Sequence, residues 1–449
     1  MIPLLIHNAF IVNEETKKTG SVLIENEKIS EIFIEKDVPK AILQQSQVLD
    51  AKNKILIPGV IDDHVHFREP GLTHKADIYS ESKAAVAGGV TSYMEMPNTK
   101  PPAVTMDQLK EKFRIAEQNS FANYSFYLGA TNENIEEIKN LNPREVCGVK
   151  TFMGASTGNM LVDNTASLEQ IFDESPVLIA THCEDETIIR NNTQYYKEQF
   201  NGTIPFEYHP LIRSEEACFK SSSRAVELAH KYGARLHILH LSTAKELKLL
   251  EKTRFNSNKQ ITAEACIHHL WFDDRDYQKY GTRIKWNPAI KKPGDKKALL
   301  DGVNNHAIDV IATDHAPHLM EEKNNPYLKA PSGGPMVQHS LLAMLEFYYR
   351  GEIPLSTIVD KMCHTPADIF NTSKRGYIRK GYWADLVLIE PFKPHRIDKD
   401  NILYKCKWSP FEGQLFNSQI THTLVNGKIA YQNGQINEEK NARKLTFER

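Results

Sequence analysis

Short apolar runs separated by turn residues occupy both ends of the chain, whereas longer periodic segments fill the middle. At the N-terminal end, residues 9–12, 21–24 and 29–34 have the length and apolar content of strands. At the C-terminal end, residues 384–389 and 421–431 have the same character. The pattern therefore predicts two β-rich ends around a middle of a different kind.

The middle repeats a unit in which an apolar strand is followed by a longer helical pattern. Segments such as 83–88, 106–119 and 221–232 have helical periodicity. The candidate strands are residues 54–66, 90–96, 124–128, 146–152, 177–182, 235–240, 260–266 and 307–314. Eight strand–helix units predict an α/β fold, a (β/α)8 barrel with insertions, the longest at 184–215. A doubly wound open sheet gives the same alternation, so the pattern alone leaves both architectures open.

Composition narrows the class of protein. The 449 residues are 41% hydrophobic and 25% charged, as in an ordinary globular chain rather than a disordered or coiled-coil one. The net charge of −2 gives no sign of a nucleic-acid or anionic-membrane partner. No apolar run approaches the roughly 18 residues of a membrane helix, and we expect no signal peptide. The six cysteines contain no CxxC pair, so we expect a reduced, cytoplasmic protein.

A histidine pair gives the sharpest local signal for chemistry. His64 and His66 are two residues apart at the end of a candidate strand, so their side chains point to the same face. Two imidazoles on one face can chelate a metal ion. For this pair taken alone, an equally good interpretation is that both histidines only form hydrogen bonds with neighbouring residues and bind no metal.

Three further strands also end on residues that bind metals. His182, His240 and Asp314 each close an apolar run. In a barrel these carboxyl ends converge on one face, where active sites lie. A single histidine at a strand end is common, but histidines and an aspartate at four strand ends are hard to explain by packing.

Lys150 lies at the end of the fourth candidate strand. A buried lysine is costly while charged, and burial lowers its pKa. The resulting neutral amine can react with carbon dioxide to form a carbamate, whose two oxygens could bridge two cations. Spacing alone favours the simpler alternative, a lysine that extends to the barrel mouth and keeps its ammonium group in water.

Together these residues resemble the amidohydrolase superfamily and, within it, the dihydroorotases. Residues 62–70 resemble the family motif DxHxHxRxP, and residues 312–318 with Lys323 resemble a second motif. Met96-Pro97-Asn98-Thr99 also fits. The resemblance covers nearly the whole chain. It implies a barrel over 55–375 and a small β-sandwich domain built from both termini, 1–54 and 376–449.

The resemblance implies a zinc enzyme that interconverts N-carbamoyl-L-aspartate and L-dihydroorotate in de novo pyrimidine biosynthesis. His64 and His66 would hold one Zn²⁺ with Asp314, and His182 and His240 would hold a second. A carboxylated Lys150 would bridge the two ions. A hydroxide shared by the metals would attack the cyclic amide, with Asp314 as base and then acid. A homodimer is usual in the family.

The substrate carboxylate accounts for a second group of residues. Arg68 can bind a carboxylate with a bidentate fork, and Asn98 can donate its amide hydrogens to the same group. By resemblance, His318 also contacts the carboxylate, Asn287 contacts the ring, and the backbone of Gly333 meets the substrate. From the residues alone, simpler interpretations stay open: Asn98 and Asn287 could be turn residues, His318 a surface histidine and Gly333 a residue of a flexible loop.

Three departures from the family pattern stand out. Asp63 occupies a position that is usually apolar or small, and Lys291 belongs to a Pro-Ala-Ile-Lys run in place of Pro-Pro-Leu-Arg. Some dihydroorotases carry an aspartate at the bridging position, where this chain has Lys150. His268 and His269 follow a strand end, and we expect them to be structural or to support the ligands.

Two other functions remain as alternatives. The first is another cyclic amidohydrolase, an allantoinase or a hydantoinase (dihydropyrimidinase). Hydantoinases place a tyrosine downstream of the lysine, whereas residues 151–156 contain none, and these enzymes generally lack an arginine at the position of Arg68. The second is a silent homologue that serves as a scaffold, although every expected ligand is present.

Overall fold

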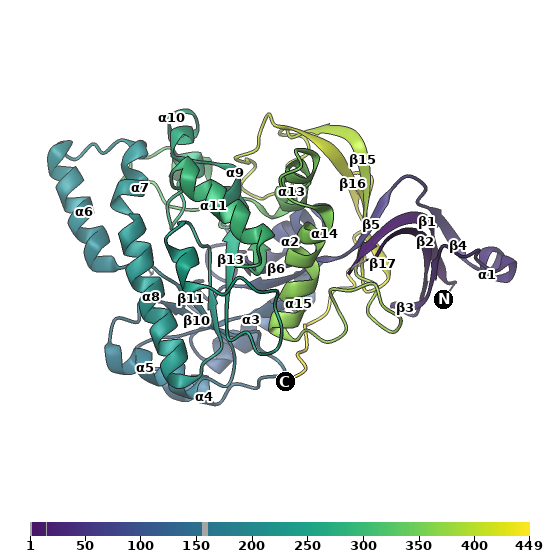
Figure 1. The fold of residues 1–449 in the computed structure, drawn as a ribbon, viewed down its shortest axis with the longest axis horizontal. Coiled ribbons are helices and arrows are strands. Elements are labelled where there is room, and N and C mark those ends of the chain that lie inside the picture. The colour runs from purple at the N-terminus through teal and green to yellow at the C-terminus, as the bar shows by residue number, and fades with distance from the viewer. Residues whose placement is uncertain (1, 15, 155–159) are drawn as a thin grey trace.

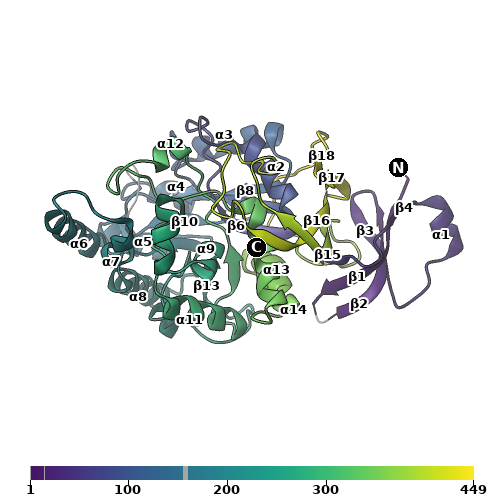
Figure 2. The same ribbon diagram turned by 90° about the horizontal axis from the view of Figure 1, so that it is seen from above.

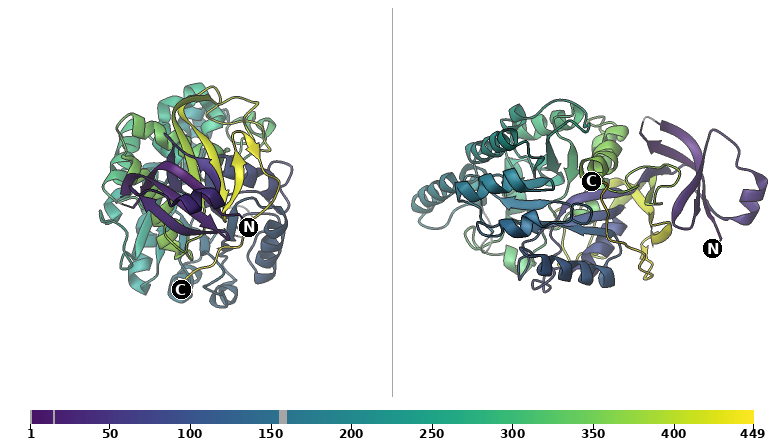
Figure 3. Two further views of the ribbon diagram at one scale, coloured as in Figure 1. Left: turned by 90° about the vertical axis from the view of Figure 1, so that its right-hand side faces the viewer. Right: turned by 90° about the horizontal axis from the view of Figure 1, so that it is seen from below.

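The terminal strands form one continuous sheet. The computed structural model describes residues 2–14, 16–154 and 160–449. The sheet contains β1 (Leu4–Asn13), β2 (Thr16–Glu25), β3 (Lys28–Ile34), β4 (Gln47–Asp50), β5 (Ile55–Pro58), β15 (Leu386–Arg396), β16 (Leu415–Val425), β17 (Lys428–Gln432) and β18 (Gln435–Ile436). Its order is β18-β17-β16-β15-β5-β1-β2-β3, with β4 added to β1. Figure 3 shows the purple N-terminal strands beside the yellow C-terminal strands, so the two ends form a single β domain.

The prediction of one strand over 54–66 is wrong, because two strands in different sheets share this run. β5 pairs with β1 and β15 in the terminal sheet, whereas β6 (Val60–Val65) pairs with β7 (Val90–Glu95). Gly59 separates them, and a Cβ there would meet Thr91 Oγ1 at 2.0 Å. Every residue of β5 and β6 is buried, so the hydrophobic pattern gave no sign that the chain passes from one sheet to another. We therefore propose that the barrel begins at Val60 rather than at residue 55.

The predicted strand over 421–431 is likewise two strands, joined in a hairpin. β16 ends at Val425 and β17 begins at Lys428. Asn426 and Gly427 between them have φ values of 48° and 77°. Positive φ at both central residues is the type I′ geometry for which Asn-Gly is preferred.

The middle of the chain is a closed barrel rather than an open sheet. Its further strands are β8 (Asn123–Phe126), β9 (Leu128–Gly129), β10 (Val149–Phe152), β11 (Ile179–His182), β12 (Leu236–Ile238), β13 (Ile261–Cys266) and β14 (Val310–Ala312). β6, β7 and β8 pair in parallel, as do β9 to β14 in order. Val65 of β6 forms a parallel bridge to His315 just after β14, which closes the ring. Counting β8 and β9 as one strand interrupted at Tyr127 gives the eight expected strands.

Helices surround the barrel and lengthen it on one side (Figure 1). α3 (Met106–Asn119) coincides with its predicted range and starts with a capping box between Thr105 and Gln108. The insertion carries α6 (Glu186–Gln199) and α7 (His209–Ile212), at the end opposite the terminal β domain (Figure 2). The other helices are α1 (Lys40–Gln45), α2 (Ile78–Ala87), α4 (Ile135–Lys139), α5 (Thr165–Glu174), α8 (Glu215–Tyr232), α9 (Ile267–Trp271), α10 (Tyr277–Tyr280), α11 (Pro293–Asn304), α12 (Met320–Lys323), α13 (Ser340–Tyr349), α14 (Leu355–Val359) and α15 (Thr365–Phe370).

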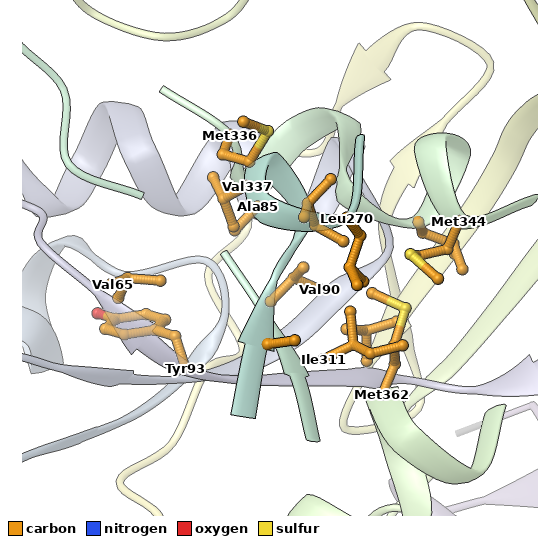
Figure 4. Packing of buried hydrophobic residues seen from close by; sticks show 14 of the residues in the cluster. Val65, Ala85, Val90, Tyr93, Leu270, Ile311, Met336, Val337, Met344 and Met362 are labelled. Atoms are coloured by element: carbon orange, nitrogen blue, oxygen red, sulfur yellow. The ribbon is translucent and has the colours of Figure 1, made fainter. Parts of the chain in front are cut away.

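The main hydrophobic core fills the space between strands and helices. Figure 4 shows Val65, Val90 and Ile311 of the strands among side chains such as Leu270 and Met344. Burial of each large apolar side chain contributes about 1.5–3 kcal/mol, so this layer stabilises the packing of the helices against the strands. Across the described parts of the chain, no helix has both the length and the apolar character required to cross a membrane.

Candidate active site

A cavity of about 320 Å³ lies where the barrel strands end. The cavity is lined by the eleven residues predicted as metal ligands or substrate contacts: His64, His66, Arg68, Asn98, Lys150, His182, His240, Asn287, Asp314, His318 and Gly333. Phe152, Trp286, Ala316, Pro331 and Ser332 complete the wall. The predicted residues thus come together at one place, although lining a cavity does not assign a role to each.

The first group of candidate ligands contains two histidines and an aspartate. Asp314 Oδ1 lies 3.1 Å from His66 Nε2 and 3.4 Å from His64 Nε2. The other ring nitrogens are occupied, because His64 Nδ1 lies 2.6 Å from Glu264 Oε1 and His66 Nδ1 lies 2.7 Å from Asn98 Oδ1. A proton held on each Nδ1 leaves the Nε2 lone pairs directed at the carboxylate, which is the arrangement of a metal site.

His182 and His240 form the second group. His182 Nδ1 lies 2.9 Å from His240 Nε2, while His182 Nε2 lies 3.0 Å from Glu184 Oε2. Burial lowers the pKa of both rings, and the neighbouring His182 lowers that of His240 further. Neutral imidazoles are the form that binds metal ions. His240 Nδ1 is buried with no hydrogen-bond partner among the described residues.

Lys150 lies between these groups on β10. Its strand pairs with β11 so that Phe152 stands opposite His182, and the Lys150 Nζ lies 4.7 Å from the centre of the Phe152 ring. Only 1% of Lys150 is exposed, which is against the alternative of an ammonium group in bulk water. Burial lowers the pKa of Lys150 to about 8, although the charges of Glu264 and Asp314 oppose this shift. A buried amine whose pKa is lowered in this way is suited to chemical modification.

These donors fit a metal ion. Imidazole nitrogens with free lone pairs, a carboxylate and a reactive amine surround one cavity. The mixed nitrogen and oxygen set is the one that zinc and neighbouring divalent metals prefer. Burial raises the pKa of Asp314, although the nearby His64 opposes this shift.

Three of the cavity residues have strained backbones. Arg68, His240 and Asp314 have φ values of 68°, 38° and 44°, in the left-handed region that non-glycine residues rarely occupy. Each such residue costs about 1–2 kcal/mol, and this strain is typically retained where it aims a functional side chain. Nothing in the local sequence signalled these conformations.

The end of the cavity near Arg68 offers both hydrogen-bond donors and acceptors. Arg68 donates from Nε to the Pro317 carbonyl at 3.1 Å, and its Nη2 lies 3.1 Å from His318 Nε2. Asn287 Oδ1 is buried without a partner among the described residues. Gly333 has a φ of 116°, and a Cβ there would meet the Ala316 carbonyl oxygen at 2.6 Å. This end therefore offers a guanidinium, an unpaired amide oxygen and a backbone conformation that favours glycine.

The structure also shows supporting residues that sequence reasoning missed. Glu264 contacts His64, Glu184 contacts His182 and Arg213, and Lys75 Nζ lies 3.1 Å from His318 Nδ1. A usable signal existed for Glu264, since a carboxylate in the apolar strand 261–266 requires a buried partner.

Other residues noted in the sequence lie outside the cavity wall. His268 stacks on Trp286 at 4.4 Å, and His269 Nε2 lies 3.0 Å from the Pro288 carbonyl. Lys291 Nζ donates to the Ala289 carbonyl at 2.9 Å. Residues 155 and 156, part of the segment that lacks a tyrosine, lie outside the described residues.

Comparisons with known proteins identify the family of the chain. The Amidohydrolase family matches residues 55–430. A dihydroorotase of Methanosphaera stadtmanae is 32% identical over 421 residues, covering 91% of this chain and 95% of that protein. A dihydroorotase of Methanosarcina acetivorans is 32% identical over 445 residues, covering 96% and 92%.

Solved structures show the same fold. An L-hydantoinase (dihydropyrimidinase) from Arthrobacter aurescens superposes with a TM-score of 0.93 at 26% identity, covering 99% of this chain and 100% of that one. A dihydropyrimidinase from Brevibacillus agri, at 24% identity, has a TM-score of 0.89 with full coverage of both chains, 100% each, and shows the fold alone. Family match, relatives and cavity together lead to one conclusion: the chain belongs to the amidohydrolase family and groups there with the dihydroorotases, as a cyclic amide hydrolase.

Proposed function

We propose that this enzyme interconverts N-carbamoyl-L-aspartate and L-dihydroorotate in de novo pyrimidine biosynthesis. The observation that carries the proposal is the Arg68 guanidinium beside His318, in the same cavity as the candidate metal ligands. Dihydroorotate has a carboxylate on its ring, and a guanidinium is the side chain best matched to it. The relatives named dihydroorotase support the same substrate.

We further propose a centre of two Zn²⁺ ions. His64, His66 and Asp314 would hold one ion, His182 and His240 the other, and a carboxylated Lys150 would bridge them. When bound, such ions lower the pKa of a water molecule and polarise the amide carbonyl. The neutral imidazoles and the lowered pKa of Lys150 support this assignment.

The residues of the chain then have distinct tasks. Asp314 would accept a proton from the attacking water and deliver it to the departing ring nitrogen, and in the reverse direction return it. Arg68, Asn98 and His318 would bind the substrate carboxylate. Asn98 accepts from His66 through its Oδ1, which leaves its amide hydrogens free for this purpose.

Asn287 and the backbone of Gly333 would orient the ring. The unpaired Asn287 Oδ1 can accept a ring N–H, which gives that buried atom the partner it lacks.

A hydantoinase or dihydropyrimidinase activity is the second candidate, favoured by the structural match to the L-hydantoinase. These two functions differ in whether the substrate ring carries a carboxylate. Turnover of dihydroorotate, allantoin and hydantoin should be measured in parallel on zinc-loaded protein. We expect turnover of dihydroorotate alone, abolished by a chelator and restored by zinc. Turnover of an uncharged ring instead would retain the metal site and overturn the proposed substrate.

Replacing Arg68 with methionine should raise the KM for dihydroorotate about 10–150-fold with a smaller effect on kcat. The expected loss corresponds to the ~1.5–3 kcal/mol of a charge-assisted hydrogen bond. Steady-state kinetics would test this, with Arg114→Met on the exposed face of α3 as the matched control. An unchanged KM in Arg68→Met would contradict carboxylate binding at this end of the cavity.

We also propose that the enzyme acts in the cytoplasm as a homodimer. All six cysteines are free and buried, which supports a reducing compartment. The dimer rests on the family resemblance, and light scattering coupled to gel filtration tests it.

A further inference from the structure

A charged layer lies inside the barrel, directly beneath the candidate metal ligands. It consists of Asp63, His237 and Glu264, which are all fully buried. His237 Nε2 lies 3.2 Å from Asp63 Oδ2 and 3.7 Å from Glu264 Oε2. Barrel interiors are usually filled by branched apolar side chains, so three ionisable groups here need an explanation.

One hydrogen bond and two nearby carboxylates indicate the protonation of His237. Thr262 Oγ1 lies 3.2 Å from the Leu236 carbonyl and donates its only hydrogen to it. The same Oγ1 lies 2.8 Å from His237 Nδ1 and must therefore accept from that nitrogen. On the other side, His237 Nε2 lies 3.2 Å from Asp63 Oδ2 and 3.7 Å from Glu264 Oε2, at ion-pair distance but not in hydrogen-bond geometry with either among the described residues. An unprotonated Nε2 would turn its lone pair toward two carboxylates, whereas a protonated ring offsets their charge, so this arrangement favours an imidazolium.

The layer is connected to both groups of metal ligands through Glu264. Its Oε1 lies 2.6 Å from His64 Nδ1 and accepts from the backbone N–H of His240 at 2.8 Å. Its Oε2 has no hydrogen bond among the described residues and faces His237. Glu264 thereby holds one ligand from each group, while His237 lies on its far side.

We propose that His237 is a positioning residue for the metal centre, an imidazolium held between Asp63 and Glu264 that keeps the Glu264 carboxylate directed at His64. Without this cation, two carboxylates would be buried side by side with no charge to offset them. The positioning role of His237 rests on the proposed metal centre. The charge of His237 does not depend on that centre.

The electrostatic balance agrees with the geometry. Burial alone would lower the pKa of His237, but hydrogen bonds and charges from Asp63 and Glu264 outweigh it and raise the pKa to about 9. The unusual aspartate at position 63 has a physical reason in this arrangement, because its carboxylate lies 3.2 Å from His237 Nε2 and offsets the charge of the ring.

Nitrogen-15 NMR of histidine-labelled, metal-free protein tests the charge directly. We expect both His237 ring nitrogens to be protonated from about pH 6 to 8, across the range in which an ordinary histidine loses its proton. The His237→Gln variant assigns the signal. A His237 ring with one unprotonated nitrogen at neutral pH would overturn the proposal, whatever the enzyme does.

Zinc affinity tests the positioning. His237→Gln should weaken zinc binding about 10–100-fold, as expected when a partner that orients a ligand is lost. His339→Gln is the matched control, since His339 is equally buried but contacts Tyr404 and Ser409. The double variant Asp63→Asn, His237→Gln should lose less zinc-binding free energy than the sum of the two single variants, because both substitutions break the same Asp63–His237 pair.

The outcomes separate the two proposals. Zinc affinity in His237→Gln that equals that of His339→Gln would refute the positioning role. A wild-type protein that binds no zinc would refute the proposed metal centre, while the NMR result would still decide the charge of His237.

Discussion

Replacing Asp314 with asparagine is expected to lower kcat about 10²–10⁴-fold while KM for dihydroorotate changes little, because a general acid and base contributes on that scale. Asparagine keeps the size of the side chain and one oxygen, but it cannot accept or deliver a proton. Asp314 is placed for this task, with Oδ1 between His64 Nε2 and His66 Nε2. Burial raises its pKa toward the range in which proton exchange at neutral pH is efficient.

Metal content must be measured with the kinetics, because Asp314 is also a proposed ligand. The informative result is a large loss of kcat in a variant that retains zinc, determined by elemental analysis. Asp107→Asn, at the exposed start of α3, is the control for the same chemical change elsewhere. Turnover near that of the wild type in Asp314→Asn would remove Asp314 from the mechanism.

The Lys150→Ala variant is expected to lose bound zinc and at least ~100-fold in turnover. Loss of a residue that only orients a metal ligand lowers metal affinity or activity about 10–100-fold. Loss of Lys150, the proposed bridging ligand, should therefore have a larger effect. In wild-type protein grown or reconstituted with ¹³C-bicarbonate, we expect a carbamate carbonyl signal by ¹³C NMR. The signal should be absent in Lys150→Ala and present in Lys361→Met, which removes another buried lysine.

The pH dependence of carboxylation follows from the lowered pKa of Lys150. Only the neutral amine reacts with carbon dioxide, and its pKa is about 8. Below that value the neutral fraction falls about tenfold per pH unit, so reconstitution should be slower at pH 6 than at pH 8. A wild-type spectrum without a carbamate signal, or full zinc content in Lys150→Ala, would contradict the bridging role.

The chain is similar to dihydroorotases in sequence and to hydantoinases in fold because the fold and the chemistry are separable. A barrel supports many reactions through changes in the residues at its carboxyl end. The metal-binding end is suited to the hydrolysis of any cyclic amide. The distinction therefore rests on the other end of the cavity, where Arg68, His318 and Asn287 lie.

Several features were predictable from the sequence because they depend on local periods. Strand period two placed His64 and His66 on one face, and the ends of apolar runs identified His182, His240 and Asp314. The helical periodicity of α3 defined its range over 106–119. These signals act within a few residues, where backbone geometry alone relates one side chain to the next.

Other features were decided only by tertiary structure. Glu264 meets His64 across 200 residues of sequence, and closure of the barrel places His237 beside Asp63. The division of 54–66 between two sheets and the left-handed backbones of Arg68, His240 and Asp314 also arise from packing. The physical reason is that a local period tells which face a side chain occupies, whereas the partner on that face is set by which strands become neighbours.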